Sequence, residues 1–347
     1  MSRPVASFVS PPLPTAVIGA GSWGTALAFV LARKLPAVTL WCREEEVAAG
    51  IRNNHRNPLF VSEFLLPENL HATTDLAEVV KNHALLVLVT PTPFLRPTLR
   101  RIKPHLHAES CFVAASKGIE TGSGALVPQI FAEELGSAWE ERLCFLSGPS
   151  FARETLAEQP TAVAIASRSL AFAQQIQELF RLPWFRTYRT SDVVGVELGG
   201  AVKNVIALAA GIADGLECGQ NARAALITRG LAETMRLGMR LGGRPETFAG
   251  LSGLGDLVLT ATSTLSRNHQ VGLRLGQGQS LQEIMAGTRE VAEGVPTCQS
   301  LNQLAEELGV EMPITRAVYH ILFENRSPRS VLEELLGRTP GTEFEES

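Results

Sequence analysis

Lys203 is an isolated charge within an apolar segment. Between Leu198 and Gly211 it is the only charged residue. A helix that is apolar on all sides is buried, and burial lowers the pKa of a lysine because it disfavours the ammonium form. A lysine with a lowered pKa suits general acid–base chemistry near neutral pH. The alternative is a lysine whose long side chain reaches the surface.

Two further residues lie where reactive groups are often found. Lys117 follows the apolar segment 110–115 and precedes Gly118, so it occupies a loop at the end of an expected strand. Asp256 follows closely spaced glycines in the segment 253–256. The alternatives are a solvated loop lysine and an aspartate that caps a helix.

Polar groups suited to an anion or a sugar occur nearer the C-terminus. Ser266-Arg267-Asn268 offers several hydrogen-bond donors in three residues, which suits a phosphate or a polyol. In the segment 289–296, Glu293 has the chemistry to contact a ribose. From composition alone, an exposed loop acid is the better interpretation of Glu293, and Arg-Asn pairs are common on surfaces.

Three glycines at fixed spacing lie near the N-terminus, between an apolar strand-like run and an apolar helix-like run. In this pattern Gly19 allows a sharp turn, Gly21 lets a pyrophosphate approach the backbone, and Gly24 lets the helix pack close to the strand. The helix N-terminus then offers free N–H groups to the phosphates. The segment 16–28 therefore predicts a dinucleotide site, and the alternative is a glycine-rich turn between two core elements.

The residue after the second expected strand, 37–41, bears on the choice of dinucleotide. An acid near this position accepts hydrogen bonds from the ribose 2′-hydroxyl of NAD, whereas an arginine pairs with the 2′-phosphate of NADP. Arg43 lies there, followed by Glu44. The pattern favours NADP(H) as cofactor and leaves NAD(H) open; the alternative for Arg43 is a solvated strand end.

Elements that can position these groups alternate through the first half of the chain. Apolar runs at 85–89, 110–115, 143–146 and 161–167 predict strands, and 94–102 predicts a helical connection. Strands that alternate with helices predict an α/β Rossmann-type doubly wound sheet. Ligands bind at the carboxyl ends of such strands, so Pro91, Lys117 and Ser150 are expected to line one crevice.

From about residue 192 the spacing is helical, with little strand signal. The predicted organisation is a loose N-terminal tail, a dinucleotide-binding Rossmann domain and an all-helical substrate-binding and catalytic domain, which span residues 1–14, 15–191 and 192–347. The apolar segment 13–32 is long enough to suggest a signal peptide or membrane span. Its glycines and its single preceding arginine argue against both.

Composition restricts the possible partners. The 347 residues are 45% hydrophobic and 19% charged with a net charge of −4, so no nucleic acid and no membrane insertion are expected. Five scattered cysteines without a C-x-x-C motif predict reduced thiols and a cytoplasmic location. The seven histidines show no ligand spacing, so no metal is expected.

Taken together, these segments resemble the bacterial-type NAD(P)-dependent glycerol-3-phosphate dehydrogenases over nearly the whole chain. The motifs that carry the resemblance are Gly19–Ala28, Ser116-Lys117-Gly118, Ser147–Ala152, Leu198–Val205, Asn221-Ala222-Arg223, Thr228–Glu233, Gly253–Leu257, Ser266-Arg267-Asn268 and Glu311–Thr315. The resemblance implies the interconversion of dihydroxyacetone phosphate and sn-glycerol 3-phosphate for phospholipid synthesis. It also implies a helical second domain and a homodimer.

The resemblance further implies roles for individual residues. Lys203 looks like the catalytic acid–base. The implied substrate contacts are Lys117, Gly148, Ser150, Lys203, Asp256, Ser266, Arg267 and Asn268. The implied cofactor contacts are Gly19, Gly21, Ser22, Trp23, Gly24, Arg43, Lys117, Ala152, Arg267, Val291 and Glu293.

This chain departs from the family pattern in a longer N-terminal tail and in Ala292, where a valine is more typical. The position of Arg43 varies in the family. Two other functions remain open: a related two-domain dehydrogenase with a different three-carbon or β-hydroxy acid substrate, and a catalytically silent NAD(P)-binding sensor. Ser266-Arg267-Asn268, as a phosphate-type site, argues against the first, and Lys117, Lys203 and Asp256 together argue against the second.

Overall fold

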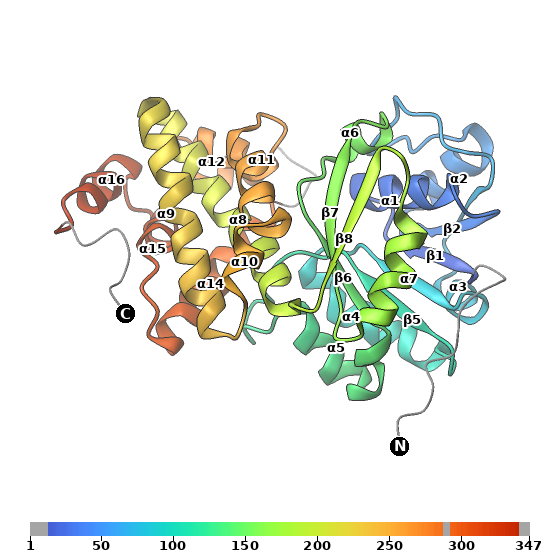
Figure 1. Ribbon diagram of the computed structural model, residues 1–347. Helices are drawn as coiled ribbons and strands as arrows, with labels where there is room; N and C mark the ends of the chain where they lie inside the picture. Colours follow the sequence, from blue (N-terminus) through green and yellow to red (C-terminus); the bar gives the residue numbers. More distant parts are fainter. Residues whose placement is uncertain (1–12, 287–291, 340–347) are drawn as a thin grey trace, which may run out of the picture.

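An eight-stranded sheet occupies the N-terminal half of the chain, and helices alone follow it in the described residues (Figure 1). The computed structural model describes residues 13–286 and 292–339. The strand order is β3-β2-β1-β4-β5-β6-β7-β8, and neighbouring strands are parallel except for β6 and β7. The strands are β1 (Thr15–Ile18), β2 (Val38–Trp41), β3 (Leu70–Thr73), β4 (Leu85–Leu88), β5 (Cys111–Ala114), β6 (Leu143–Ser147), β7 (Thr161–Ala166) and β8 (Phe185–Thr190). This topology confirms the predicted doubly wound sheet.

The two strands that sequence analysis did not predict lie at the edges of the sheet. β3 reads Leu-His-Ala-Thr, and β8 reads Phe-Arg-Thr-Tyr-Arg-Thr. An edge strand has one neighbour and is partly solvated, so it lacks the continuous apolar run of a central strand.

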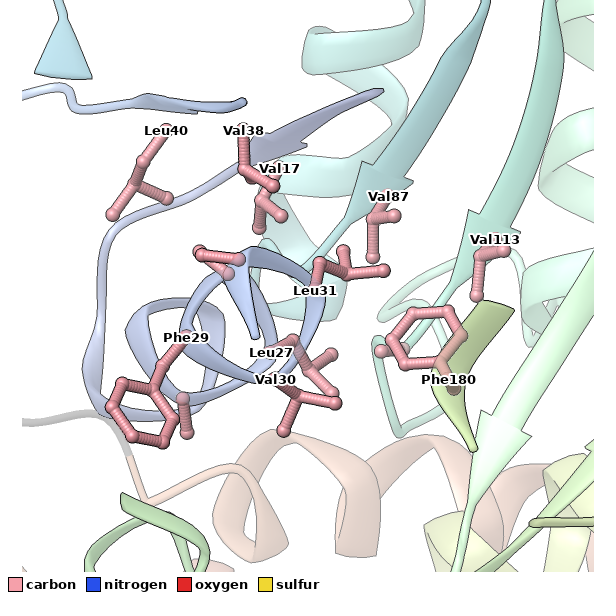
Figure 2. Close-up of a cluster of buried hydrophobic side chains, with 14 of the residues drawn as sticks. Val17, Leu27, Phe29, Val30, Leu31, Val38, Leu40, Val87, Val113 and Phe180 are labelled. Carbon is pink, nitrogen blue, oxygen red and sulfur yellow. The ribbon is translucent and has the colours of Figure 1, made fainter. Parts of the chain in front are cut away.

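Helices cover both faces of the sheet. On one face α1, the helix that follows the glycine turn, packs on β1 and β2, and its Leu27 and Leu31 share a core cluster with Val17 of β1 and Val87 of β4 (Figure 2). On the other face Ile18 and Leu88 belong to the same core cluster as Leu99. The helices of this half are α1 (Ser22–Ala32), α2 (Glu45–Asn54), α3 (Leu76–Asn82), α4 (Thr92–Ile102), α5 (Val127–Leu135), α6 (Ala152–Leu156) and α7 (Leu170–Phe180), with short turns η1 (Lys103–His105) and η2 (Ser137–Arg142).

The helical half is built around α8, which carries Lys203. This 23-residue helix is long and apolar enough to cross a membrane, but 83% of its most apolar part is buried by the protein, as in a core helix. The other elements are α9 (Gly219–Arg240), α10 (Pro245–Phe248), η3 (Leu251–Gly255), α11 (Asp256–Thr262), α12 (Arg267–Gly276), α13 (Leu281–Ala286), α14 (Gly294–Leu308), α15 (Pro313–Phe323) and α16 (Pro328–Leu336), and α8 itself is Val193–Gly215.

Glycines let α8 and α12 cross at close range. A Cβ on Gly211 would lie 2.1 Å from the carbonyl oxygen of His269, and one on Gly272 would lie 2.1 Å from that of Leu208. Real Cβ atoms do not approach backbone so closely, so only glycine permits this crossing. The close packing fixes the N-terminus of α12 beside the middle of α8.

Gly272→Ala is expected to destabilise the protein by about 1–3 kcal/mol, because the added methyl group would force the two helices apart. The measurement is the free energy of unfolding in urea. Gly255→Ala is the matched control: Gly255 has helical backbone angles, and its Cβ would meet nothing nearer than 3.6 Å. The account of the crossing is wrong if Gly272→Ala is as stable as this control.

Candidate functional site

A cavity of about 620 Å³ lies at the carboxyl ends of the strands and extends to α8, α11 and α12. Pro91, Lys117 and Ser150 all line it, as the crevice prediction required. The other predicted site residues on its wall are Gly19, Gly21, Ser22, Trp23, Gly24, Arg43, Ala152, Lys203, Ser266, Arg267, Asn268 and Glu293. Gly148 and Asp256 lie behind the wall, and Val291 lies outside the described residues.

The glycine turn between β1 and α1 has the geometry of a dinucleotide site. Gly19 has a φ of +114°, a conformation that side chains rarely adopt, and a Cβ on Gly24 would lie 1.8 Å from the carbonyl oxygen of Gly19. A Cβ on Gly21 would meet nothing within 4 Å, so open space lies beside its backbone. The buried indole nitrogen of Trp23 has no hydrogen-bond partner in the described structure. The turn therefore offers both space and an unused donor to a ligand.

Lys203 and Lys117 share one buried carboxylate. The ammonium of Lys203 donates to Asp256 Oδ1 at 2.6 Å, and that of Lys117 donates to Asp256 Oδ2 at 2.8 Å. Lys203 also donates to Thr260 Oγ1 at 3.1 Å, and Lys117 to the Gly148 carbonyl at 3.3 Å. The Asp256 side chain is 1% exposed, and those of Lys203 and Lys117 are 11% and 14% exposed. The site thus joins a residue of the sheet half to two of the helical half.

Burial controls the protonation of Lys203. It lowers the pKa of Lys203 to about 8; the carboxylate of Asp256 opposes this effect, and the charge of Lys117 adds to it. The Lys203 side chain lines the cavity and ends at Asp256 behind its wall, so the alternative of a lysine that reaches the surface is wrong. The alternative of Asp256 as a helix cap is also wrong, because its carboxylate binds the two lysines and Gly255 holds the cap position.

A short π-helix, η3, places Asp256 beside Lys203. The turn packs directly on α8, where a Cβ on Gly199 would lie 2.4 Å from the carbonyl oxygen of Ser252. Ser252 also donates to the Ser147 carbonyl at 3.2 Å, which ties η3 to the end of β6. π turns are rare and occur mainly at functional sites. Here the turn sets the register of α11 so that its first residue faces the lysines.

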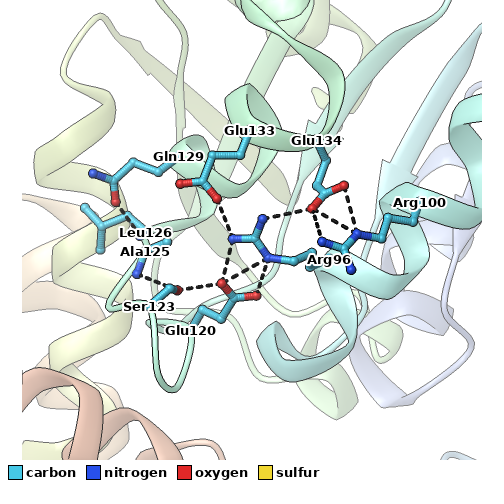
Figure 3. Close-up of polar contacts among 9 residues, drawn as sticks. All are labelled: Arg96, Arg100, Glu120, Ser123, Ala125, Leu126, Gln129, Glu133 and Glu134. Carbon is cyan, nitrogen blue, oxygen red and sulfur yellow. Dashed lines mark hydrogen bonds and ion pairs between the residues drawn. The ribbon is translucent and has the colours of Figure 1, made fainter.

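The loop after β5 holds Lys117 in place. Gly118 has a φ of +151°, and the stem of Lys117 passes close to Gly200 of α8. Three residues beyond Lys117, Glu120 accepts hydrogen bonds from Arg96 at 2.7 and 2.8 Å (Figure 3). The same guanidinium bonds Glu134 of α5 at 2.9 Å, and the Arg96 and Glu120 side chains are only 17% and 14% exposed. This partly buried cluster anchors the Lys117 loop to α4 and α5.

Ser266, Arg267 and Asn268 begin α12, and the N-terminus of this helix faces the cavity. The Ser266 hydroxyl caps the helix by accepting from the His269 amide at 3.3 Å. Asn268 donates to Asn204 Oδ1 at 2.9 Å and accepts from the Gly294 amide at 3.0 Å, so it joins three helices. A helix N-terminus with an adjacent arginine is suited to bind a phosphate.

Glu293 is part of the cavity wall rather than a fully exposed loop acid. Burial raises its pKa, and the charges of Arg267, Lys117 and Lys203 oppose that shift. Arg43 is different: its side chain is 71% exposed and is paired with Glu44 at 2.5 Å. Arg43 lines the cavity, as expected for a cofactor contact, and it is also solvated, as expected for an exposed strand end. The structure therefore agrees in part with both interpretations of Arg43.

Sequence analysis missed several residues of the site. Thr260 and Asn204 line the cavity, and Thr260 bonds Lys203. Glu197 is buried six residues before Lys203 on α8, behind the cavity wall. Burial raises the pKa of Glu197 to about 8, and the charge of Lys117 opposes the shift. Its Oε2 has no hydrogen-bond partner in the described structure. A carboxyl group at the edge of the apolar segment 198–211 was the available signal for Glu197.

The fold and the cavity together define an NAD(P)-dependent dehydrogenase of the type that joins a Rossmann sheet to a helical region. Comparison with known proteins specifies the family. Residues 14–173 match the family model for the NAD-dependent glycerol-3-phosphate dehydrogenase N-terminus, and residues 192–333 match the model for its C-terminus. The chain belongs to the NAD-dependent glycerol-3-phosphate dehydrogenase family. Its activity is that of an NAD(P)-dependent oxidoreductase.

Individual relatives agree with this assignment. A glycerol-3-phosphate dehydrogenase [NAD(P)+] of Leptospira biflexa is 52% identical over 93% of this chain and 97% of its own length. A glycerol-3-phosphate dehydrogenase [NAD(P)+] of Syntrophotalea carbinolica is 50% identical over 95% of this chain and 99% of its own length. The crystal structure of glycerol-3-phosphate dehydrogenase from Coxiella burnetii has a TM-score of 0.89 at 40% identity and covers 94% of this chain and 99% of that one.

Glu197→Gln is expected to flatten the dependence of stability on pH. The pKa of Glu197 is raised in the folded protein from 4.5 to about 8, so the folded state binds more protons than the unfolded state between these values. The stabilisation that comes from the neutral Glu197 carboxyl group is complete below pH 4.5 and is lost as the pH rises through about 8. Relative to the glutamine variant, the wild type is therefore expected to lose stability between these two pH values.

The measurement is the thermal midpoint of both proteins across this pH range. Glu109→Gln, at an exposed position, is the control and is expected to run parallel to the wild type. Parallel curves for wild type and Glu197→Gln would show that Glu197 is ionised in the folded protein at neutral pH.

Proposed function

We propose that this enzyme interconverts dihydroxyacetone phosphate and sn-glycerol 3-phosphate with Lys203 as the acid–base. The observation that carries the proposal is the shared Asp256 carboxylate, which holds Lys203 and Lys117 at the cavity wall at 2.6 and 2.8 Å. Sequence relatives named glycerol-3-phosphate dehydrogenase [NAD(P)+] support the substrate pair. The product would serve as the backbone for glycerophospholipid synthesis.

The residues of the glycine turn fit a nicotinamide dinucleotide. Gly21 leaves open space beside the backbone, and the buried indole N–H of Trp23 has no partner in the described structure. Ser22, Trp23 and Gly24 open α1, whose first N–H groups suit a pyrophosphate. When bound, the cofactor supplies or accepts the hydride at the carbon that carries the reacting oxygen. Ala152, Arg267 and Glu293 line the same cavity and are further proposed cofactor contacts.

Lys203 then handles the proton. In the reduction its ammonium donates a proton to the oxygen of the former ketone as the hydride reaches the carbon, and in the oxidation its amine takes that proton back. A pKa of about 8 keeps both forms accessible near neutral pH. A cation that faces a forming alkoxide in a dry cavity stabilises the transition state by several kcal/mol, roughly a thousandfold in rate.

Asp256 acts through the lysines rather than at the cavity surface. Its two oxygens bind one ammonium each, so the carboxylate orients both cations and favours their charged forms. Lys117, Ser150 and the N-terminus of α12 with Ser266, Arg267 and Asn268 would hold the substrate and its phosphate. A fixed phosphate places the reacting carbon, and such positioning lowers the barrier.

Lys203→Ala is expected to lower turnover with dihydroxyacetone phosphate about a thousandfold or more, because the variant lacks the ammonium that donates a proton to the forming alkoxide. The wild-type rate of reduction is expected to fall as the pH rises through about 8, where Lys203 loses its proton. The residual rate of the variant is expected to lack this fall. The measurement is the oxidation of reduced cofactor between about pH 6 and 10.

Lys81→Ala removes an exposed lysine at the end of α3 and serves as the control, with unchanged kinetics expected. If Lys203→Ala folds normally and loses less than about tenfold in turnover, the lysine is not the acid–base.

NADP(H) is the proposed preferred cofactor, with NAD(H) as a possible second one. Arg43 follows β2, where an arginine suits the 2′-phosphate, and it lines the cavity. Arg43→Asp is expected to lower kcat/KM for NADPH about tenfold to a hundredfold and to leave NADH within a few-fold, because the new carboxylate repels the phosphate. Initial rates with each cofactor measure the ratio. The role of Arg43 is refuted if the wild type uses both equally and the variant keeps that ratio.

Three further features belong to the proposal. The enzyme is proposed to be a cytoplasmic homodimer, in line with five free cysteines and with the family resemblance. Its division into a Rossmann domain, 15–191, and a helical domain, 192–347, is supported by the end of β8 at Thr190 and the start of α8 at Val193. The residues of the tail before Leu13 lie outside the described structure.

A further inference from the structure

Helix α4 presents two different faces to its surroundings. Phe94, Pro97, Thr98 and Arg101 line the cavity, and their spacing places them on one side of a helix. Arg96 and Arg100 lie on another side, where both bind Glu134 of α5 at 2.9 Å (Figure 3). The basic residues of α4 are therefore divided. Two are used to hold the fold together, and Arg101 faces the space where a ligand binds.

Arg101 rests on an aromatic ring at the adenosine end of the cavity. Its guanidinium carbon lies 5.6 Å from the centre of the Trp41 ring, within the range of a cation–π contact. Trp41 is the last residue of β2 and donates from Nε1 to the Thr74 carbonyl at 2.9 Å, which fixes the ring. Trp41 lies two residues before Arg43, so the ring holds the Arg101 guanidinium near the end of β2. A Rossmann site recognises the ribose at this end of the second strand.

Arg101 determines the net charge at this end of the cavity. Arg43 is paired with Glu44 at 2.5 Å, and Glu44 also lines the cavity, so this pair adds no net charge. Arg101 forms no ion pair with a carboxylate among the residues that the structure describes. A 2′-phosphate beside Glu44 needs a net positive neighbour, and a guanidinium binds phosphate with two parallel hydrogen bonds.

We infer that Arg101 is a second specificity-determining residue, which binds the 2′-phosphate of NADP(H) together with Arg43. The inference rests on the proposed preference for NADP(H) and deepens it. Arg43 neutralises Glu44, and Arg101 supplies the net charge that an additional phosphate requires. NAD(H) lacks this phosphate, so its affinity does not depend on Arg101.

The test uses the full-length enzyme and two adenosine probes, adenosine 2′,5′-bisphosphate and 5′-AMP, with dissociation constants from calorimetry. Arg101→Gln is expected to weaken the bisphosphate about tenfold to a hundredfold and to leave 5′-AMP within about threefold. Arg101→Lys keeps the charge and is expected to recover part of the loss. Arg100→Ala, which removes the same charge from the other side of α4, is the matched control and is expected to leave both constants unchanged.

The outcomes separate this inference from the proposal that it deepens. If the wild type binds both probes equally, there is no 2′-phosphate site and the preference for NADP(H) fails. If the wild type prefers the bisphosphate and Arg101→Gln keeps that preference, Arg43 suffices and only the role of Arg101 is overturned. An equal loss for both probes in Arg101→Gln also overturns it, since Arg101 would then contact the adenosine common to both.

Discussion

The contact on which the rest of the structure depends is the Asp256 carboxylate shared by Lys203 and Lys117. A buried carboxylate is costly unless its charge and its hydrogen-bonding capacity are met, and two ammonium groups meet both requirements. Lys117 follows β5 and Asp256 begins α11, so the contact spans 139 residues of sequence and fastens the helical half to the sheet. The group that orients the proposed acid–base, Lys203, thus also links the two halves of the fold.

Much of the surrounding packing serves to bring these three groups together. Glycines on α8 let η3 and the end of β6 approach the helix. A Cβ on Gly199 would lie 2.4 Å from the carbonyl oxygen of Ser252, and one on Gly200 would lie 2.7 Å from Ser147 Oγ. The apolar surroundings then shift the Lys203 pKa towards neutrality. Close packing and altered protonation have one origin here, because the same exclusion of water that the glycines permit disfavours the ammonium.

The sequence predicted the parts whose signal is local. The central strands, the glycine turn and the isolated charge of Lys203 each combine a continuous apolar run with one exceptional residue, and such patterns are legible without a structure. The edge strands β3 and β8 lack that pattern. Thr260 reaches Lys203 only through the packing of α11 on α8, and Arg101 reaches the cavity through the rotation of α4, so their spacing along the chain carries no sign of a shared cavity.

The two ends of the cavity differ in how far their charged residues are buried. This difference determines which substitutions the protein can accept without losing stability. At the reacting end, Lys203, Lys117 and Asp256 are buried and mutually paired, so replacing one leaves another buried charge uncompensated. At the adenosine end, Arg43 and Arg101 are exposed, where substitutions change stability little. The proposed acid–base chemistry is therefore tied to the integrity of the fold, whereas the proposed choice between NADP(H) and NAD(H) involves exposed charges that can be exchanged without disturbing it.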